Sequence, residues 1–123
     1  MILRSRLHIL AALWIDLGRQ LSQLDHPRAE TDHGAHLTDL LITLAVYVGT
    51  TADRPMTASR LAATVGLPRT TVLRRLALLE RAGRVERRGQ AWRTPLAHHL
   101  ALEQGNLAAI AALVAAAAAE LAP

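Results

Sequence analysis

Apolar residues recur at helical spacing near both ends of the chain. From Leu3 to Leu24 they follow alternating steps of four and three residues, which is the heptad pattern of a helix packed along another helix. Residues 25–27 end this pattern, because the residue before a proline disfavours the helical region. From Leu107 to Leu121 a second series again steps by three and four within an alanine-rich stretch. Both segments are therefore predicted to pack against other helices.

The first part of the middle segment predicts a loop followed by a helix. Residues 26–36 are polar and contain Gly34, so they predict a loop. Thr38 is the predicted N-cap of a helix that runs to about residue 50. Apolar residues occupy most sides of this helix, and we expect it to be central in the fold.

Two further helices follow, separated by a tight turn. Residues 57–66 predict a short helix with Thr57 as its N-cap and Gly66 as its stop. Pro68 fits the first position of the next helix, which is expected to run to about residue 82. Its predicted buried face consists of Val72, Leu76 and Leu79.

A short alternating pattern comes after these helices. Residues 84–87 and 91–93 alternate on either side of Arg88-Gly89-Gln90, which predicts a small β-hairpin. A helical segment is expected from Pro95 onward, and residues 105–106 leave open whether it is one bent helix or two. The predicted fold class is mainly α with a small β-hairpin.

Composition narrows the classes of protein that fit this pattern. The 123 residues suit one domain, and 51% of them are hydrophobic, as in a globular chain. Cysteine is absent from the sequence, which excludes disulfide frameworks, thiol catalysis and cysteine-based zinc sites. All 14 basic residues are arginine, and 24 alanines and 23 leucines favour helices.

The positive charge is concentrated in one part of the chain. Between Arg54 and Arg93 there are ten arginines and two acidic residues, whereas the remainder has four arginines and eight acidic residues. A basic block in an otherwise acidic chain indicates a nucleic-acid surface. The alternative is a solvated charged face.

Helix, glycine turn, helix and arginine-rich hairpin is the layout of a winged helix-turn-helix. Residues 56–85 resemble bacterial winged-helix transcription regulators, most of all the multiple-antibiotic-resistance regulator (MarR) family, with some similarity to the IclR family over residues 67–76. The residues that carry the resemblance are Ala62, Gly66, Val72, Leu76, Leu79 and Gly83. The resemblance implies a DNA-binding repressor whose terminal helices form a dimer.

Candidate DNA contacts lie on the second helix of the motif and on the hairpin. A helix fits the major groove with its N-terminal residues at the base edges, so Arg69 and Thr70 are the first base-reading candidates. Arginine in a hairpin can follow the backbone or enter a narrow minor groove. The other candidates are Thr71, Arg74, Arg75, Arg87, Arg88, Gln90 and Arg60. The alternative role for the threonines is local helix capping, and Trp92 is expected to pack on the domain.

The sequence predicts a single domain of residues 1–123 with three functional parts. Residues 38–94 form the winged-helix core, and residues 1–25 and 95–123 are the expected dimerisation segments. Most oligomers are two-fold symmetric, and a dimer reads two half-sites. The alternative is that both terminal helices pack only on their own subunit.

Other chemistry has weaker support in the sequence. Asp32, His33 and His36 are weak candidates for metal ligands, because nitrogen and oxygen donors would suit zinc or nickel. No phosphate-binding glycine loop, nucleophile elbow or paired-acid motif is present. We therefore expect no enzymatic activity and no cofactor.

The sequence also bears on where the protein is located and on which other functions fit it. The apolar N-terminal stretch is interrupted by His8 and Asp16, and the run over residues 107–119 is too short to span a bilayer. A cytoplasmic, nucleoid-associated protein is expected. The alternatives to a DNA-binding regulator are a winged-helix protein-interaction module that does not bind DNA, and a regulator that responds to a metal or small ligand.

Overall fold

The computed structural model describes residues 5–25 and 33–123, and these residues form helices and three short strands. They fall into two compact units. One unit consists of the two terminal segments, and the other consists of the middle of the chain, residues 30–102.

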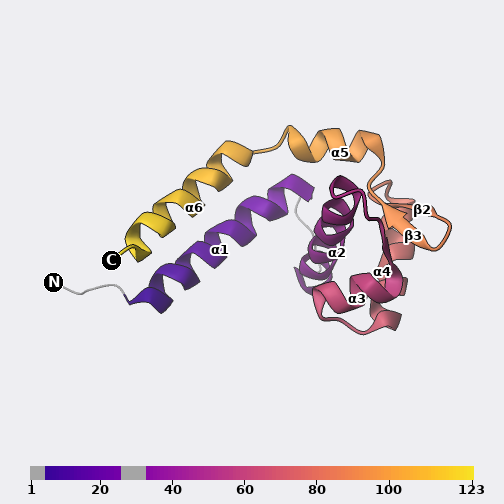
Figure 1. Cartoon of the computed structure of the whole chain (residues 1–123), viewed down its shortest axis with the longest axis horizontal. Coiled ribbons are helices and arrows are strands. Elements are labelled where there is room, and N and C mark those ends of the chain that lie inside the picture. Colours follow the sequence, from indigo (N-terminus) through magenta and orange to yellow (C-terminus); the bar gives the residue numbers. More distant parts are fainter. Residues whose placement is uncertain (1–4, 26–32) are drawn as a thin grey trace. The chain divides into compact units, whose positions relative to one another are not determined.

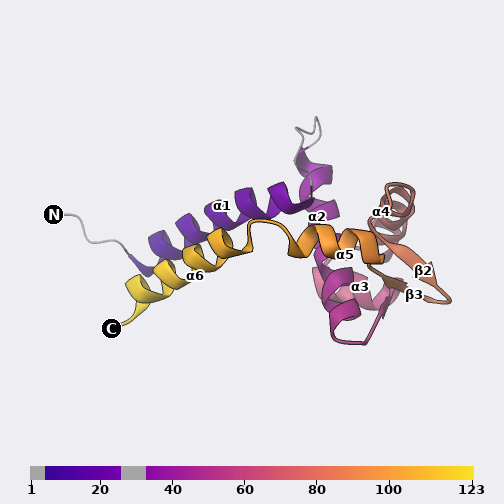
Figure 2. The same ribbon diagram turned by 90° about the horizontal axis from the view of Figure 1, so that it is seen from above.

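The terminal unit is a pair of helices. α1 (Arg6–Asp25) and α6 (Leu107–Leu121) lie side by side and run in opposite directions (Figures 1 and 2). Ile9 and Ala117 are buried in this pair, and Asn106 donates a hydrogen bond from Nδ2 to Oε1 of Gln20. The two terminal helices predicted from periodicity are thus present.

The residues that α1 presents to α6 differ from the predicted heptad line. Ile9 is 8% exposed, whereas Leu7 is 75%, Leu10 48% and Trp14 76% exposed. The reason is that α1 carries two apolar lines, and the one containing Ile9 and Leu13 contacts α6. The N-terminal part of the predicted line therefore remains on the surface of this pair, whereas Leu17 and Leu21 of the same line are half-buried.

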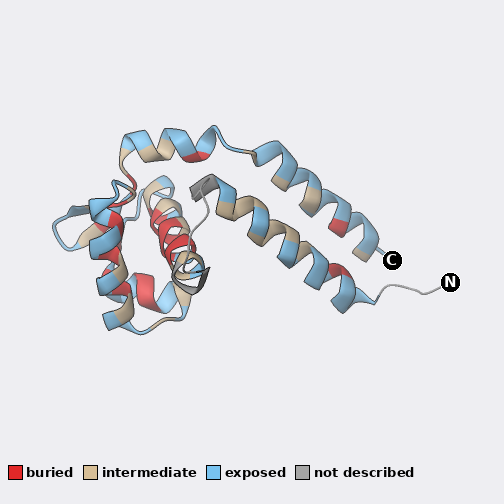
Figure 3. Ribbon diagram, turned by 180° about the vertical axis from the view of Figure 1, so that it is seen from behind, coloured by how far each residue is buried: buried red, intermediate tan, exposed pale blue. Residues whose placement is uncertain are grey.

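Three helices of the middle unit surround its core. α2 (His33–Thr51), α3 (Ala58–Val65) and α4 (Arg69–Arg81) turn their buried sides toward one another (Figure 3). The predicted buried face of α4 is confirmed, since Val72, Leu76 and Leu79 are at most 2% exposed. The other large core residues are Ile42, Val46, Leu61, Val85 and Trp92.

α2 begins earlier than predicted. The helix includes residues 33–36, which the polar composition assigns to a loop, and Thr38 lies within it rather than at its N-cap. Polar side chains and one glycine do not prevent a helix when a long apolar face, here from Leu40 onward, packs against the core. The rest of the predicted loop, residues 26–32, lies outside the described residues.

A small antiparallel sheet flanks the helices. β1 (Met56–Thr57), β2 (Glu86–Arg88) and β3 (Ala91–Arg93) pair in the order β1-β3-β2. The predicted hairpin is confirmed, and Trp92 packs on the domain with 6% exposure. Close approach of α2 to β1 requires Gly49, because a Cβ there would lie 2.9 Å from the carbonyl oxygen of Arg54.

The C-terminal segment is two helices. α5 (Leu96–Glu103) ends before α6 begins, with a break over residues 104–106. In the described part of the chain, no single helix is long and apolar enough to cross a membrane; α5 and α6 pass that test only when they are taken together across the break.

Candidate nucleic-acid interface

Local sequence fixes the two helices of the motif and the turn between them. The Thr57 side chain accepts a hydrogen bond from the backbone N–H of Arg60 and caps α3, as predicted. Gly66 ends α3 with φ of 73°, a left-handed conformation that glycine adopts without steric cost. Pro68 occupies the N-cap of α4 rather than its first helical position. The turn is therefore short and well determined.

The exposed side of α4 is set by its buried side. Because Val72, Leu76 and Leu79 anchor the helix in the core, the residues between them face away from it. Arg69, Thr70 and Arg74 are exposed, and Thr71 is half-buried. The N-terminal end of α4 thus presents guanidinium and hydroxyl groups to solvent.

Arg69 is held in place by the other helix of the motif. Its Nε donates a hydrogen bond of 3.1 Å to Oγ of Ser59, which lies in the first turn of α3. This bond uses Nε of the guanidinium, whose remaining donors are on its two terminal nitrogens. Arg69 is therefore oriented before any ligand arrives. Ser59 is a positioning residue that sequence reasoning did not identify.

The hairpin formed by β2 and β3, hereafter the wing, has two different faces. Arg87 is paired with Trp92 in the strand register, so their side chains share one face. Arg87 donates from Nε to the carbonyl oxygen of Gly89 at 3.0 Å, and its guanidinium carbon lies 5.9 Å from the centre of the Trp92 ring. Arg87 is thus fixed at the turn of the wing.

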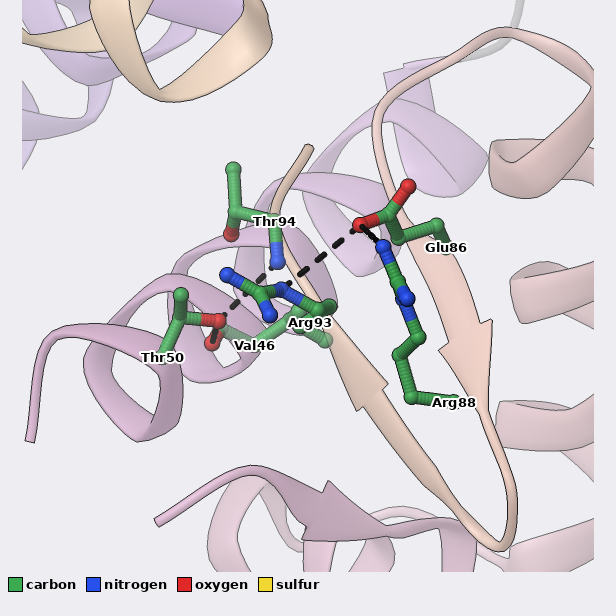
Figure 4. Close-up of polar contacts among 6 residues, drawn as sticks. All are labelled: Val46, Thr50, Glu86, Arg88, Arg93 and Thr94. Atoms are coloured by element: carbon green, nitrogen blue, oxygen red, sulfur yellow. Dashed lines mark hydrogen bonds and ion pairs between the residues drawn. The ribbon is translucent and has the colours of Figure 1, made fainter. Parts of the chain in front are cut away.

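The other face of the wing carries an ion-paired cluster. Arg88 and Arg93 both approach Oε1 of Glu86, at 3.4 Å and 3.6 Å (Figure 4). The predicted wing contacts Arg87 and Arg88 therefore lie on opposite faces, and Arg88 shares its positive charge with a carboxylate. The sequence pattern places Arg88 in the turn, but in the structure it is the last residue of β2, and strand alternation therefore sends it to the face opposite Arg87.

A groove separates the N-terminal end of α4 from the wing. Its volume is about 310 Å³, and Arg69 and Leu73 line one side of it while Arg87, Gln90 and Trp92 line another. Thr57, Ala58 and Ser59 complete the lining. The groove brings together the predicted residues Arg69, Arg87 and Gln90. Thr70, Thr71, Arg74 and Arg60 are not among its lining residues; the first three lie along α4, and Arg60 is exposed on α3.

Arg75 has a different place from the one that the sequence predicts for it. Its Nε and Nη2 atoms each lie 2.7 Å from one carboxylate oxygen of Asp39 on α2, in a two-pronged ion pair. The Arg75 side chain is 21% exposed and that of Asp39 is 11% exposed. This guanidinium therefore joins α4 to α2 instead of extending from the exposed side of α4.

Residues 41–88 match the family model of a helix-turn-helix domain. The match covers less than half of the chain and includes α3, the turn, α4 and β2. Neither the comparison with curated proteins nor that with solved structures gave a match. The middle unit therefore carries a winged helix-turn-helix, a fold that binds DNA through its second helix, and this domain class is not an enzymatic one.

The predicted metal ligands do not form a site in the described residues. Among those residues, no group of three or more histidine, cysteine or acidic side chains could hold a metal ion. Asp32 lies outside the described residues, and His33 and His36 belong to the first turn of α2. The metal site predicted for residues 32–36 therefore stays a prediction from the sequence.

Proposed function

We propose that the protein is a dimeric, sequence-specific DNA-binding transcriptional regulator that acts at the nucleoid and represses by occupying a promoter. The observation that carries this proposal is the arrangement of Arg69 and Arg87 on two sides of one groove, each oriented by a hydrogen bond. Both groups are arginines that can donate to phosphates or to base edges.

α4 is the proposed recognition helix in the major groove. Arg69, Thr70 and Arg74 face solvent at its N-terminal half, which is the part of a recognition helix that reaches base edges. Arg69 and Thr70 are the proposed base-reading residues. Arg74, Thr71 and Arg60 are proposed to contact phosphates or bases beside them. Arg75 is left out of this set because Asp39 holds its guanidinium.

The wing is proposed to follow the DNA backbone or the minor groove. Arg87 and Gln90 line the same groove as Arg69, so a duplex that engages α4 has its flanking phosphates near them. Arg88 contributes less to binding in this proposal, because Glu86 neutralises part of its charge.

The terminal unit is the proposed dimer interface. Two helices alone leave Leu7, Leu10 and Trp14 of α1 and Leu107 and Val114 of α6 exposed. At about 100° per residue, the α1 set lies roughly 100–160° from the buried Ile9, and the α6 set lies roughly 60–80° from the buried Ala117, in the same rotational sense. In an antiparallel pair these two sets fall on the same side.

A continuous apolar face of this kind indicates an interface. The proposed occupant is a second copy of the chain, which would give four helices around a common core. This use of the terminal helices is also what the resemblance to the MarR family implies.

The salt dependence of DNA binding tests the central claim. Binding to mixed genomic fragments, measured by fluorescence anisotropy at two salt concentrations, should weaken steeply as salt rises. The slope of log affinity against log salt should be about −0.9 for each phosphate contacted. Absence of binding at low salt would instead favour a winged-helix module that docks on proteins.

Two arginine variants separate the proposed roles of helix and wing. Arg69→Ala should cost about 1–3 kcal/mol at particular base pairs and relax preference there. Arg87→Ala should weaken binding to all DNA sequences alike. It should also reduce the magnitude of the slope of log affinity against log salt by about 1. Site selection from a random library, followed by sequencing, measures both. Arg81→Ala is the matched control, since Arg81 is exposed at the far end of α4. Equal losses of DNA affinity in all three variants would contradict the roles proposed for Arg69 and Arg87.

A further inference from the structure

One exposed apolar side chain lies among the polar residues of the groove between α4 and the wing. Leu73 of α4 is 36% exposed and lines this groove together with Arg69 and Arg87. The described residues that line the groove include no acidic side chain, so its charge suits a phosphate backbone. Leucine has no hydrogen bond to offer, and any contact that Leu73 makes with DNA is therefore apolar.

Leu73 lies on the same side of α4 as the two proposed base-reading residues. At about 100° per residue, it is roughly 40° around the helix from Arg69 and roughly 60° from Thr70, and it lies between them. The rotation of the helix is fixed by Val72 and Leu76, which are fully buried in the core. A duplex that brings base edges to Arg69 and Thr70 therefore also brings a base edge to Leu73.

The chemistry of the base edges decides which base suits an apolar side chain. In the major groove, guanine, adenine and cytosine present hydrogen-bonding groups, whereas thymine also presents its C5-methyl group. When leucine covers a donor or an acceptor, that group loses water without gaining a partner, which is unfavourable. When leucine covers a methyl group, apolar surface is removed from water, which is favourable. An apolar side chain at this position thus favours thymine.

The spacing along α4 limits where this thymine lies. Four residues separate Leu73 from Arg69, which corresponds to about 6 Å along the helix axis. Successive bases of one strand are about 3.4 Å apart along the duplex. The two side chains therefore reach base pairs that are no more than about two steps apart.

We propose that Leu73 is a specificity-determining residue that recognises the C5-methyl group of a thymine within about two base pairs of the base that Arg69 reads. This inference rests on the proposed DNA-binding function and extends it. It assigns a second kind of readout to α4, in which an apolar contact acts beside the hydrogen bonds of the guanidinium.

Replacing thymine by uracil tests this contact, because uracil lacks only the methyl group. The full chain is titrated with the site obtained by selection from a random library, and with copies in which one thymine at a time is replaced by deoxyuridine. Fluorescence anisotropy at constant salt measures the affinities. One replacement, near the base pair whose preference is relaxed in Arg69→Ala, should weaken binding about fourfold, which is the effect of one buried methyl group.

Three variants of α4 assign the effect to a side chain. Leu73→Ala should bind the thymine and uracil sites equally, because the apolar partner is gone. Leu73→Met keeps an apolar side chain and should retain the difference. Leu78→Ala is the matched control and should also retain it, since Leu78 is exposed on α4 at 42% but lies about 180° around the helix from Arg69. Circular dichroism checks the folding of each variant, and the wild-type comparison of thymine with uracil depends on none of them.

The outcomes separate this inference from the proposed function. The role of Leu73 would be overturned, with the proposed function intact, if the protein bound DNA but the selected site had no thymine in that interval, or if uracil there bound as well as thymine. A thymine preference that persisted in Leu73→Ala would assign the contact to another residue and would also overturn it. Absence of DNA binding at low salt would overturn both.

Discussion

Replacing Asp39 by alanine should lower the free energy of unfolding by about 3 kcal/mol. The carboxylate and the guanidinium of Arg75 are joined by two short hydrogen bonds, and both side chains are largely removed from water. Removing one partner leaves a charge in a poorly solvated place, and this cost exceeds that of losing an exposed ion pair. The expected loss lies at the lower end of the range of free energies lost when one partner of a buried ion pair is removed, because a fifth of the Arg75 side chain is exposed. Urea unfolding followed by circular dichroism measures the change.

A double variant separates the cost of burying a lone charge from the value of the pair. Asp39→Leu combined with Arg75→Met replaces both charges by apolar groups, and it should recover most of the stability. If Arg75 contacted DNA, this double variant would bind DNA more weakly, and the magnitude of its slope of log affinity against log salt would fall by about 1. We expect the slope to remain that of the wild type. Arg19→Met, which breaks the exposed pair with Asp16 at 2.9 Å, is the control and should change stability by less than about 1 kcal/mol.

Introducing carboxylates on the exposed apolar face of α1 should convert the proposed dimer to a monomer. Leu10→Glu combined with Trp14→Glu places two charges where the second copy is proposed to pack. Affinity for a two-half-site DNA should then fall by about 100-fold, since the second half-site no longer benefits from linkage. Light scattering coupled to size-exclusion chromatography gives the mass, and fluorescence anisotropy gives the DNA affinity.

The control for this experiment lies on the same helix. Gln23 is exposed and lies on the side of α1 opposite Leu10 and Trp14, so Gln23→Glu should leave the mass unchanged. Helix content should also be retained in the double variant, because both residues are already exposed within one chain. A wild-type mass for the double variant would show that another surface forms the dimer or that the chain is monomeric.

Periodicity and capping residues were sufficient to predict most of the fold. Val72, Leu76 and Leu79 are spaced at helical intervals, and Thr57 and Gly66 mark the ends of α3 by their side-chain chemistry and backbone freedom. These signals involve residues that are close together in the chain, so they can be recognised in a single sequence. The third strand was missed because Met56–Thr57 is only two residues long and pairs with a partner far along the chain.

The candidate site was predictable in composition but not in detail. The concentration of arginine identified the surface, yet the sequence could not show that Arg75 turns to Asp39, 36 residues earlier. It also did not separate Arg87 from Arg88, because the sequence pattern places Arg88 in the turn, whereas in the structure Arg88 is the last residue of β2. On α1, two apolar lines compete, and only the position of α6 decides which of them is covered. In each case the missing information is a contact between distant segments.

The pairing of α1 with α6 imposes an order on biosynthesis. The whole helix-turn-helix unit is translated between these two helices, which takes roughly ten seconds at common elongation rates. During that interval α1 has left the ribosome with its apolar residues unmatched, while the middle of the chain can already fold. The residues of α1 that α6 covers, among them Ile9, therefore stay uncovered by it until the C-terminal end of the chain has been made.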